Sequence, residues 1–235
     1  MQFTKLLAQK KPGSNARPLS IAFFGDSVTH GCFEIYNDGA TFDFDAVYHR
    51  QLRRLFAAAF PGVPINMINA GVGGDNAQMG LARIERDVLS FSPDLTVVCF
   101  GLNNAPQGEE GLEVFRETLV QIFRKLKAGQ TEVLFMTPNM MNTRILSTVC
   151  ESFKTFAGVT AQTQNSGMMD RYMDTAREVC AQEKVALCDC YKKWKGLEAA
   201  GADPTLMLVN GMNHPTREMH GLFATSLFDT ILFSE

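Results

Sequence analysis

A serine near the start of the chain and a histidine near its end are the residues best suited to do chemistry together. Ser27 stands in the stretch GDSVTHG at 25–31, directly after an apolar run, and His214 stands in VNGMNHPT at 209–216. A serine hydroxyl is a poor nucleophile until a neighbouring base takes its proton, and histidine is the commonest base. The alternative role for Ser27 is to cap the helix that follows it. The pair predicts acyl-transfer chemistry, provided that the fold brings the two ends of the chain together.

The other three histidines are weaker candidates for the base. His30 lies near the first strand, His49 lies in a helical pattern, and His220 lies in the last helical segment. His214 precedes a proline and a helix, so it is expected on a loop that can reach back to Ser27.

Two segments that follow later apolar runs carry groups able to stabilise a developing negative charge. The stretch GVGGD at 71–75 lacks the GxGxxG spacing of a dinucleotide-binding loop, so we interpret it as a tight loop that presents a backbone N–H. Asn103 follows the next apolar run, and its side-chain amide can donate to an oxyanion. Taken alone, Asn103 is better explained as a residue that satisfies backbone groups of its own loop.

Short apolar runs alternate with helical segments, and this pattern predicts the elements that must position these residues. Strands are expected at 19–24, 65–68, 95–100, 132–136 and 185–188. Helices are expected at 44–60, 77–89, 112–127, 169–183 and 218–232. The alternation predicts an α/β fold with a mainly parallel five-stranded sheet covered on both faces. Ligands bind beyond the carboxyl ends of such strands, so Ser27 and Asn103 should meet at that edge.

The composition limits the class of protein and its partners. The 235 residues, 46% of them hydrophobic, can bury the core of a single domain spanning 1–235. A formal charge of -3 leaves no basic face for nucleic acid, and no apolar stretch approaches the eighteen residues of a membrane span. The N-terminal segment has no run typical of a signal peptide, and the six cysteines show no CxxC spacing. We therefore expect a cytoplasmic protein with reduced thiols and no metal site.

The stretch 139–167 is the least regular part of the sequence and is rich in Thr, Asn, Ser and Met. We interpret it as a lid or insertion beside the site, with a plain surface excursion as the alternative.

Four short blocks resemble, in order and spacing, those of the SGNH (GDSL) hydrolase superfamily. They are GDS at 25–27, NAGVGGD at 69–75, GLNN at 101–104 and NHP at 213–215. The resemblance implies a flavodoxin-like three-layer α/β/α sandwich, in which Ser27 is the nucleophile and His214 is the base. No metal or organic cofactor is needed for such chemistry.

The same resemblance assigns the groups that assist the nucleophile. It implies an oxyanion hole made by the backbone N–H groups of Ser27 and Gly74 and by the side chain of Asn103. Asp26 and Asn104 are expected to support these residues. Position 104 is Asn where the superfamily usually has Asp, which should affect the architecture of the loop rather than the chemistry.

A second departure from the superfamily concerns the acid of the triad. This acid usually stands three or four residues before the histidine, where the present chain has Gly211 and Asn210. Asn210 is expected in the place of the acid, where its carbonyl can accept a hydrogen bond from the ring but offers no negative charge. The alternatives are a Ser-His dyad steadied by a backbone carbonyl, or an acid from elsewhere, with Asp203 nearest in sequence.

Together these features predict a serine hydrolase that cleaves esters through an acyl-enzyme. The site segments have no long apolar lining and 139–167 is polar, so a short acyl ester of a carbohydrate or small metabolite is the expected substrate. A lysophospholipase or thioesterase of the same superfamily is one alternative, because methionine-rich stretches can line an acyl pocket. A non-catalytic binding module that has lost the triad acid is another. A nucleotide-binding domain is disfavoured by the missing glycine fingerprint.

Overall fold

Five parallel strands form the central sheet of the computed structural model, which describes residues 1–13 and 17–233. Their order across the sheet is β4-β1-β5-β6-β7, and each neighbouring pair is parallel. The strands are β1 (Leu19–Gly25), β4 (Ile65–Gly71), β5 (Leu95–Cys99), β6 (Glu132–Met136) and β7 (Ala186–Cys188). This order is that of flavodoxin-like folds, and it confirms the predicted α/β class.

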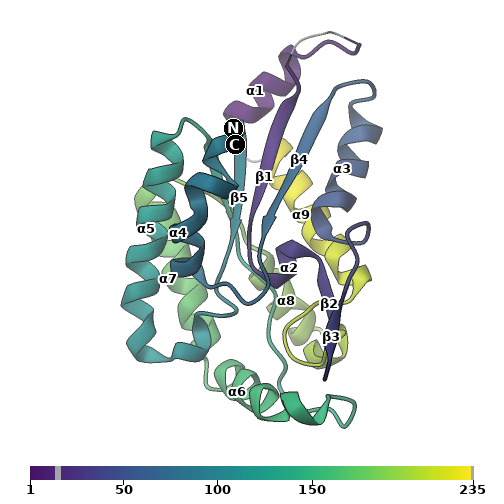
Figure 1. The fold of residues 1–235 in the computed structure, drawn as a ribbon, viewed down its shortest axis with the longest axis vertical. Coiled ribbons are helices and arrows are strands. Elements are labelled where there is room, and N and C mark those ends of the chain that lie inside the picture. Colours follow the sequence, from purple (N-terminus) through teal and green to yellow (C-terminus); the bar gives the residue numbers. More distant parts are fainter. Residues whose placement is uncertain (14–16, 234–235) are drawn as a thin grey trace.

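Helices cover both faces of the sheet, which makes three layers (Figure 1). On one face α3 (Tyr48–Ala59) packs against α9 (Arg217–Phe233), and α1 (Gln2–Gln9) and α8 (Cys190–Ala199) also contact α9. On the other face α5 (Leu112–Ala128) packs between α4 (Ala77–Asp87) and α7 (Met168–Glu183). A helix in such a layer buries one apolar stripe against the sheet. In α5 that stripe is Phe115, Leu119, Ile122, Phe123 and Leu126, which follow the helical period.

The two central strands form the middle of the core. Every residue of β1 and of β5 is buried. Strands covered by helices on both faces read as continuous apolar runs rather than alternating ones, which is why LSIAFF and LTVVCF were recognisable in the sequence. Because β1 is such a covered strand, Ser27, which follows it, lies at one end of the core.

The five expected strands and five expected helices are all present, with bounds shifted by a few residues. The largest shift is at α3, which begins at Tyr48 rather than at position 44. The residues before it belong to a hairpin that was not predicted, formed by β2 (Cys32–Tyr36) and β3 (Gly39–Phe42) in a separate two-stranded antiparallel sheet. Helices α1 and α8 were not predicted either. Short 3-10 turns complete the list: η1 (Leu89–Phe91), η2 (Ala105–Gln107), η3 (Glu109–Gly111), η4 (Glu151–Phe153) and η5 (Pro204–Met207).

The stretch 139–167 is more regular than its composition suggested. It contains η4 and the helix α6 (Lys154–Asn165), which lies beyond the carboxyl ends of the strands and contacts α7 (Figure 1). The buried face of α6 consists of small and polar residues, namely Ala157, Thr160, Ala161, Thr163 and Gln164. Because so few of these are large and apolar, the helical period was weak in the sequence.

Among the helices in the described part of the chain, none is long and apolar enough to cross a membrane.

Candidate active site

Ser27 is the first residue of the short helix α2 (Ser27–His30), directly beyond the carboxyl end of β1. Asp26 caps this helix, since its Oδ1 accepts a hydrogen bond from the backbone N–H of Val28 at 3.0 Å. The first N–H groups of a helix have no acceptor within the helix, so the backbone N–H of Ser27 is free to serve a ligand. The alternative reading of Ser27 as a helix cap is therefore wrong: Asp26 is the cap.

Two glycines let the chain pass closely at this turn. A Cβ atom on Gly25 would lie 2.7 Å from the carbonyl oxygen of Cys99 and would also overlap the side chain of Thr29. A Cβ atom on Gly71 would overlap the backbone of His30. Any side chain at either position would therefore push the nucleophile turn away from its neighbouring strands.

His214 contacts Ser27 although the two residues lie 187 positions apart in the sequence. The distance from Ser27 Oγ to His214 Nε2 is 2.9 Å, and His214 Nδ1 lies 2.8 Å from the carbonyl oxygen of Phe33. A carbonyl oxygen can only accept, so Nδ1 carries the proton and Nε2 is left as the acceptor for the serine hydroxyl. Burial lowers the pKa of His214 to about 4, while the hydrogen bond to Phe33 acts in the opposite direction. The ring is therefore neutral near pH 7, as a general base must be.

Asn210 does not take the role expected of it. Its Oδ1 accepts hydrogen bonds from the backbone N–H groups of Met212, Asn213 and His214 at 3.0, 3.0 and 2.9 Å. Its Nδ2 donates to Asn213 Oδ1 at 3.0 Å. Three donors converge on one oxygen, so Asn210 shapes the loop that carries His214 and leaves the imidazole ring to the carbonyl of Phe33.

The other acid considered in the sequence, Asp203, is also occupied elsewhere. Its Oδ2 pairs with Arg144 at 2.5 Å, and its Oδ1 accepts from the backbone N–H of Thr205 at 2.9 Å. Both proposals for a side chain behind the ring are therefore corrected, and the geometry is that of a Ser-His dyad steadied by a backbone carbonyl.

Gly74 and Asn103 line the same cavity as Ser27 and His214. Asn103 Nδ2 donates one hydrogen bond to the carbonyl oxygen of Asp75 at 2.8 Å. An amide nitrogen carries two hydrogens, so the second one is left for a ligand. This arrangement brings the three expected oxyanion donors to one place at the carboxyl edge of the sheet.

The two supporting residues lie next to the site without entering the cavity. Asn104 Oδ1 accepts from the backbone N–H of Ala77 at 3.1 Å, and its Nδ2 donates to Gln78 Oε1 at 2.8 Å. Asn104 thus fixes the start of α4, in keeping with an architectural role. Asp26 is buried, which raises the pKa of its carboxyl to about 7, and its Oδ2 has no hydrogen-bond partner in the described part of the chain.

Arg83 in α4 joins the two loops that carry the nucleophile and the glycine donor. Its guanidinium donates to the carbonyl oxygens of Gly25 at 2.9 Å and Ala70 at 2.8 Å, and to Asp75 Oδ2 at 2.5 Å. Sequence reasoning missed this residue, because one arginine in an amphipathic helix gives no signal of which loops it will reach.

The cavity above Ser27 has a volume of about 340 Å³ and mostly apolar walls. The hairpin contributes Cys32, Ile35, Ala40 and Phe42, and the stretch 139–167 contributes Phe153 and Phe156. The four site segments themselves carry no long apolar lining, as the sequence indicated, but the hairpin and the stretch 139–167 supply apolar walls that were not anticipated. The aromatic residues of this lining are isolated from one another in the sequence. They come together only when the hairpin and η4 fold over the sheet.

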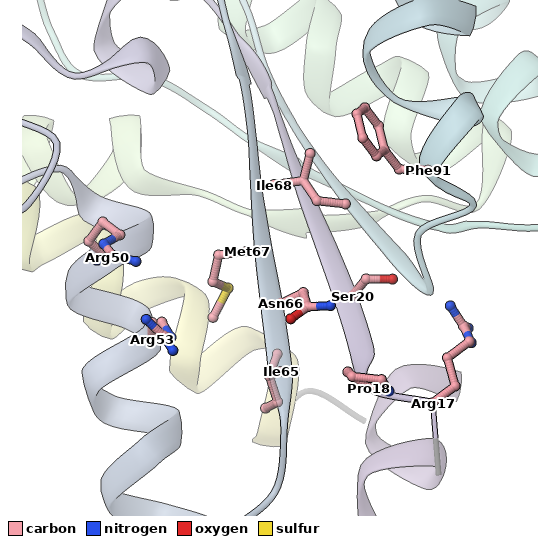
Figure 2. Close-up of a pocket in the computed structure, with 10 residues that line it drawn as sticks. All are labelled: Arg17, Pro18, Ser20, Arg50, Arg53, Ile65, Asn66, Met67, Ile68 and Phe91. Carbon is pink, nitrogen blue, oxygen red and sulfur yellow. The ribbon is translucent and has the colours of Figure 1, made fainter. Parts of the chain in front are cut away.

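A larger hollow of about 480 Å³ lies around the edge strand β4, away from this chemistry (Figure 2). Arg50 and Arg53 approach β4 from one side, and Arg17 and Phe91 approach from the other. None of the predicted site residues lines this hollow, so volume alone does not identify the functional site. Within residues 1–13 and 17–233, no group of three or more His, Cys, Asp or Glu side chains is arranged to hold a metal ion.

Comparison with known structures shows the same fold in several hydrolases. An acetylxylan esterase from Geobacillus stearothermophilus aligns with a TM-score of 0.68 at 20% identity, over 96% of this chain and 98% of that one. A lipase/acylhydrolase from Enterococcus faecalis aligns with a TM-score of 0.67 at 23% identity, over 91% and 95% of the two chains. An α/β hydrolase enzyme from the metagenome of Lake Arreo, Spain, aligns with a TM-score of 0.68 at 20% identity, over 96% and 99%. Curated protein sequences give no match to this chain.

The family comparison extends over most of the chain. The model of the GDSL-like lipase/acylhydrolase family matches residues 23–222, a range that runs from β1 to α9 and contains all four sequence blocks. This chain belongs to the GDSL-like lipase/acylhydrolase family and is an esterase-type hydrolase.

Proposed function

We propose that the chain hydrolyses carboxylic esters through an acyl-enzyme formed on Ser27, with His214 as the general base. The observation that carries this proposal is the hydrogen-bonded line from Ser27 Oγ to His214 Nε2 and from His214 Nδ1 to the Phe33 carbonyl. It supplies a nucleophile, a base in the correct tautomer, and a group that orients the base.

The reaction would proceed in two halves. Ser27 Oγ attacks the ester carbonyl while its proton passes to His214 Nε2, and the C=O electrons move to the oxygen. The oxyanion is held by the backbone N–H groups of Ser27 and Gly74 and by Asn103 Nδ2. Its collapse expels the alcohol, which takes the proton from His214. Water then attacks the acyl-enzyme with His214 again as base, releasing the acid and restoring Ser27.

The group behind the proposed base is neutral in this chain. Two solved variants of the Geobacillus acetylxylan esterase, described as catalytic mutants, exchange a serine and an aspartate for alanine. In the present chain the contact behind His214 is the neutral Phe33 carbonyl. A carbonyl fixes the ring and its tautomer but adds no charge to stabilise the imidazolium, so the proposed mechanism is that of a dyad.

A short acyl ester of a carbohydrate or small metabolite is the substrate we propose. A concave site with mostly apolar walls and a few convergent polar groups suits a small-molecule ligand, and a structural neighbour acts on acetylated xylan, as its name states. The second candidate is an esterase for longer acyl groups, such as a lysophospholipase or thioesterase. The aromatic lining by Phe42, Phe153 and Phe156 favours it. The expected cytoplasmic location stays a prediction.

A labelling experiment tests the dyad directly. A fluorophosphonate probe should modify Ser27, as mapped by mass spectrometry, and the Ser27→Ala and His214→Ala variants should lose both labelling and ester hydrolysis. A non-catalytic binding module would give no labelling and no burst with an activated ester. A series of p-nitrophenyl esters from acetate to octanoate then separates the two substrate candidates by the ratio of their kcat/KM values.

A further inference from the structure

The carbonyl that holds His214 belongs to an irregular part of the β2–β3 hairpin. Cys32 pairs with Phe42 and Ile35 pairs with Ala40, so β2 carries one more residue than β3 across this interval. Phe33 lies within it. An extra residue in one strand of an antiparallel pair leaves backbone groups out of the ladder, and such bulges often lie beside active sites. The Phe33 carbonyl is thereby freed to accept from His214.

A bulge in an isolated hairpin needs support from outside the hairpin. Two-stranded sheets are marginally stable alone, and β2 and β3 form no pairing with the central sheet. A carbonyl that orients a base must nevertheless keep its place to within a few tenths of an ångström.

Arg217, at the start of α9, contacts the hairpin at the bulge of β2 and again directly after β3. Its Nη1 and Nη2 donate to the two carboxylate oxygens of Glu34 at 2.7 and 3.2 Å, and its Nε donates to Asp43 Oδ2 at 2.8 Å. Its Cζ also lies 4.4 Å from the centre of the Phe33 ring. One guanidinium therefore reaches the residue whose carbonyl holds the base, the residue after it, and the residue that follows β3.

The charges and the exposure of these side chains indicate that the contacts of Arg217 position the hairpin and contribute little to the stability of the fold. Hydrogen bonds from Arg217 lower the pKa values of Glu34 and Asp43, so both carboxylates are ionised at neutral pH. The three side chains are 34%, 24% and 32% exposed, and ion pairs this exposed contribute little to the stability of a fold. Arg217 lies only three positions after His214, so it also joins the loop of the base to the hairpin.

We propose that Arg217 is a positioning residue for the base: it fixes the bulge of β2 so that the Phe33 carbonyl keeps His214 aligned with Ser27. This inference depends on the proposed esterase function of Ser27 and His214. The planar guanidinium can hold Glu34 in a two-point contact and Asp43 at the same time, which a lysine ammonium cannot do.

The test compares Arg217→Gln and Arg217→Lys with Arg171→Gln. The control removes another exposed arginine–glutamate contact, between Arg171 in α7 and Glu109 in η3. Arg217→Gln should lower kcat on a short acyl ester by about tenfold or more, because small misplacements of a catalytic group are costly. Arg217→Lys should recover part of this loss, and Arg171→Gln should behave as wild type. The melting temperature of all three should stay near that of the wild type.

A pH profile provides a readout that a structural role alone would not move. When the hairpin loosens, water reaches the buried ring, and the acid limb of kcat/KM in Arg217→Gln should move to higher pH. If Arg217→Gln fails to fold, the Glu34→Gln/Asp43→Asn double variant removes both charge contacts from the hairpin side and should show the same loss of kcat. Wild-type kcat and an unmoved acid limb in a folded variant of either kind would overturn the proposal. Ser27→Ala, measured in parallel, reports separately on the proposed function.

Discussion

The proton on His214 Nδ1 is held by the carbonyl oxygen of Phe33 at 2.8 Å, from a hairpin 181 positions earlier in the chain. A carboxylate in this place would attract the imidazolium formed during catalysis and raise the pKa of the ring. A carbonyl attracts the imidazolium only weakly. The effect of burial therefore outweighs that of the hydrogen bond, and the pKa of His214 falls to about 4. In the proposed mechanism, His214 is thus unprotonated and able to act at neutral pH, but it is a weaker base than the histidine of a full triad.

This difference should be visible in the pH dependence of activity. Protonation of His214 removes the base, so kcat/KM should fall toward low pH with a midpoint near the pKa of about 4. An unperturbed histidine would place this limb near 6.5. Initial rates on a short acyl ester, with circular dichroism at each pH to confirm that the chain is folded, measure the midpoint. A midpoint near 6.5 would show that the ring is solvated during turnover.

Adding a negative charge at the expected acid position should not improve the enzyme. Asn210 uses its oxygen for three backbone N–H groups and does not contact the ring, so Asn210→Asp should give no gain in kcat. Gly211→Asp should destabilise the loop, because Gly211 has a φ of 67° and its Cβ would lie 3.0 Å from Val149 Cγ2. Steady-state kinetics and thermal melts of both variants test this. A large gain in Asn210→Asp would mean that the aspartate reaches the ring.

The sequence predicted those parts of the fold that depend on regular periods. The covered strands read as apolar runs, and α5 and α9 showed the helical spacing of their buried faces. The hairpin was missed because β2 and β3 are short, partly exposed and interrupted by a bulge, so strict alternation is absent. Helix α6 was missed because its buried face is formed by alanine, threonine and glutamine.

The same reasoning explains which site residues could be anticipated. Ser27 and Asn103 follow buried parallel strands, and the topology of such sheets brings these positions together. The partner of His214 Nδ1 is a main-chain carbonyl. Every residue carries such a carbonyl whatever its side chain, so no residue type marks Phe33 in the sequence. Arg83 and Arg217 likewise contact residues that are distant in the sequence, and a local sequence pattern does not indicate such contacts.

Asp26 should make the stability of the protein depend on pH. Its pKa is about 7 in the fold, raised by burial, against 3.8 when exposed, so the folded state binds the proton more tightly. The contribution of this proton to the free energy of unfolding is fully present below pH 3.8 and is lost as the pH rises to about 7. Asn retains the oxygen that caps α2, so Asp26→Asn should be more stable than wild type at pH 8 by up to about 4 kcal/mol. Urea unfolding at pH 4 and pH 8 tests this, and an equal difference at both values would contradict it.

Arg83 should matter for stability as well as for activity. The side chain of Arg83 is 10% exposed and pairs with Asp75, which is 6% exposed, so Arg83→Gln leaves a carboxylate buried without its partner. Breaking such a pair costs about 3 kcal/mol or more, and the turn of Ser27 loses its contact through Gly25. Arg86→Gln on the same helix is the control, because Arg86 is 76% exposed. Equal urea midpoints for the two variants would rule out this role.

The length of the acyl group accepted should depend on Phe153. Phe153 and Ile35 line both the catalytic cavity and a neighbouring cavity of about 180 Å³, so these side chains lie between the two spaces. Phe153→Ala should join the cavities and let longer acyl chains enter, each buried methylene adding about 0.8 kcal/mol of binding.

Phe156 provides the matched control for this prediction, because it lines the catalytic cavity but not its neighbour. The ratio of kcat/KM for octanoate to that for acetate should rise in Phe153→Ala and change far less in Phe156→Ala, since only the first substitution opens a second space. Measurement on p-nitrophenyl esters of four to eight carbons locates the chain length at which the gain begins. A similar rise in both variants would mean that general widening of the mouth, rather than a partition at Phe153, sets the acyl length.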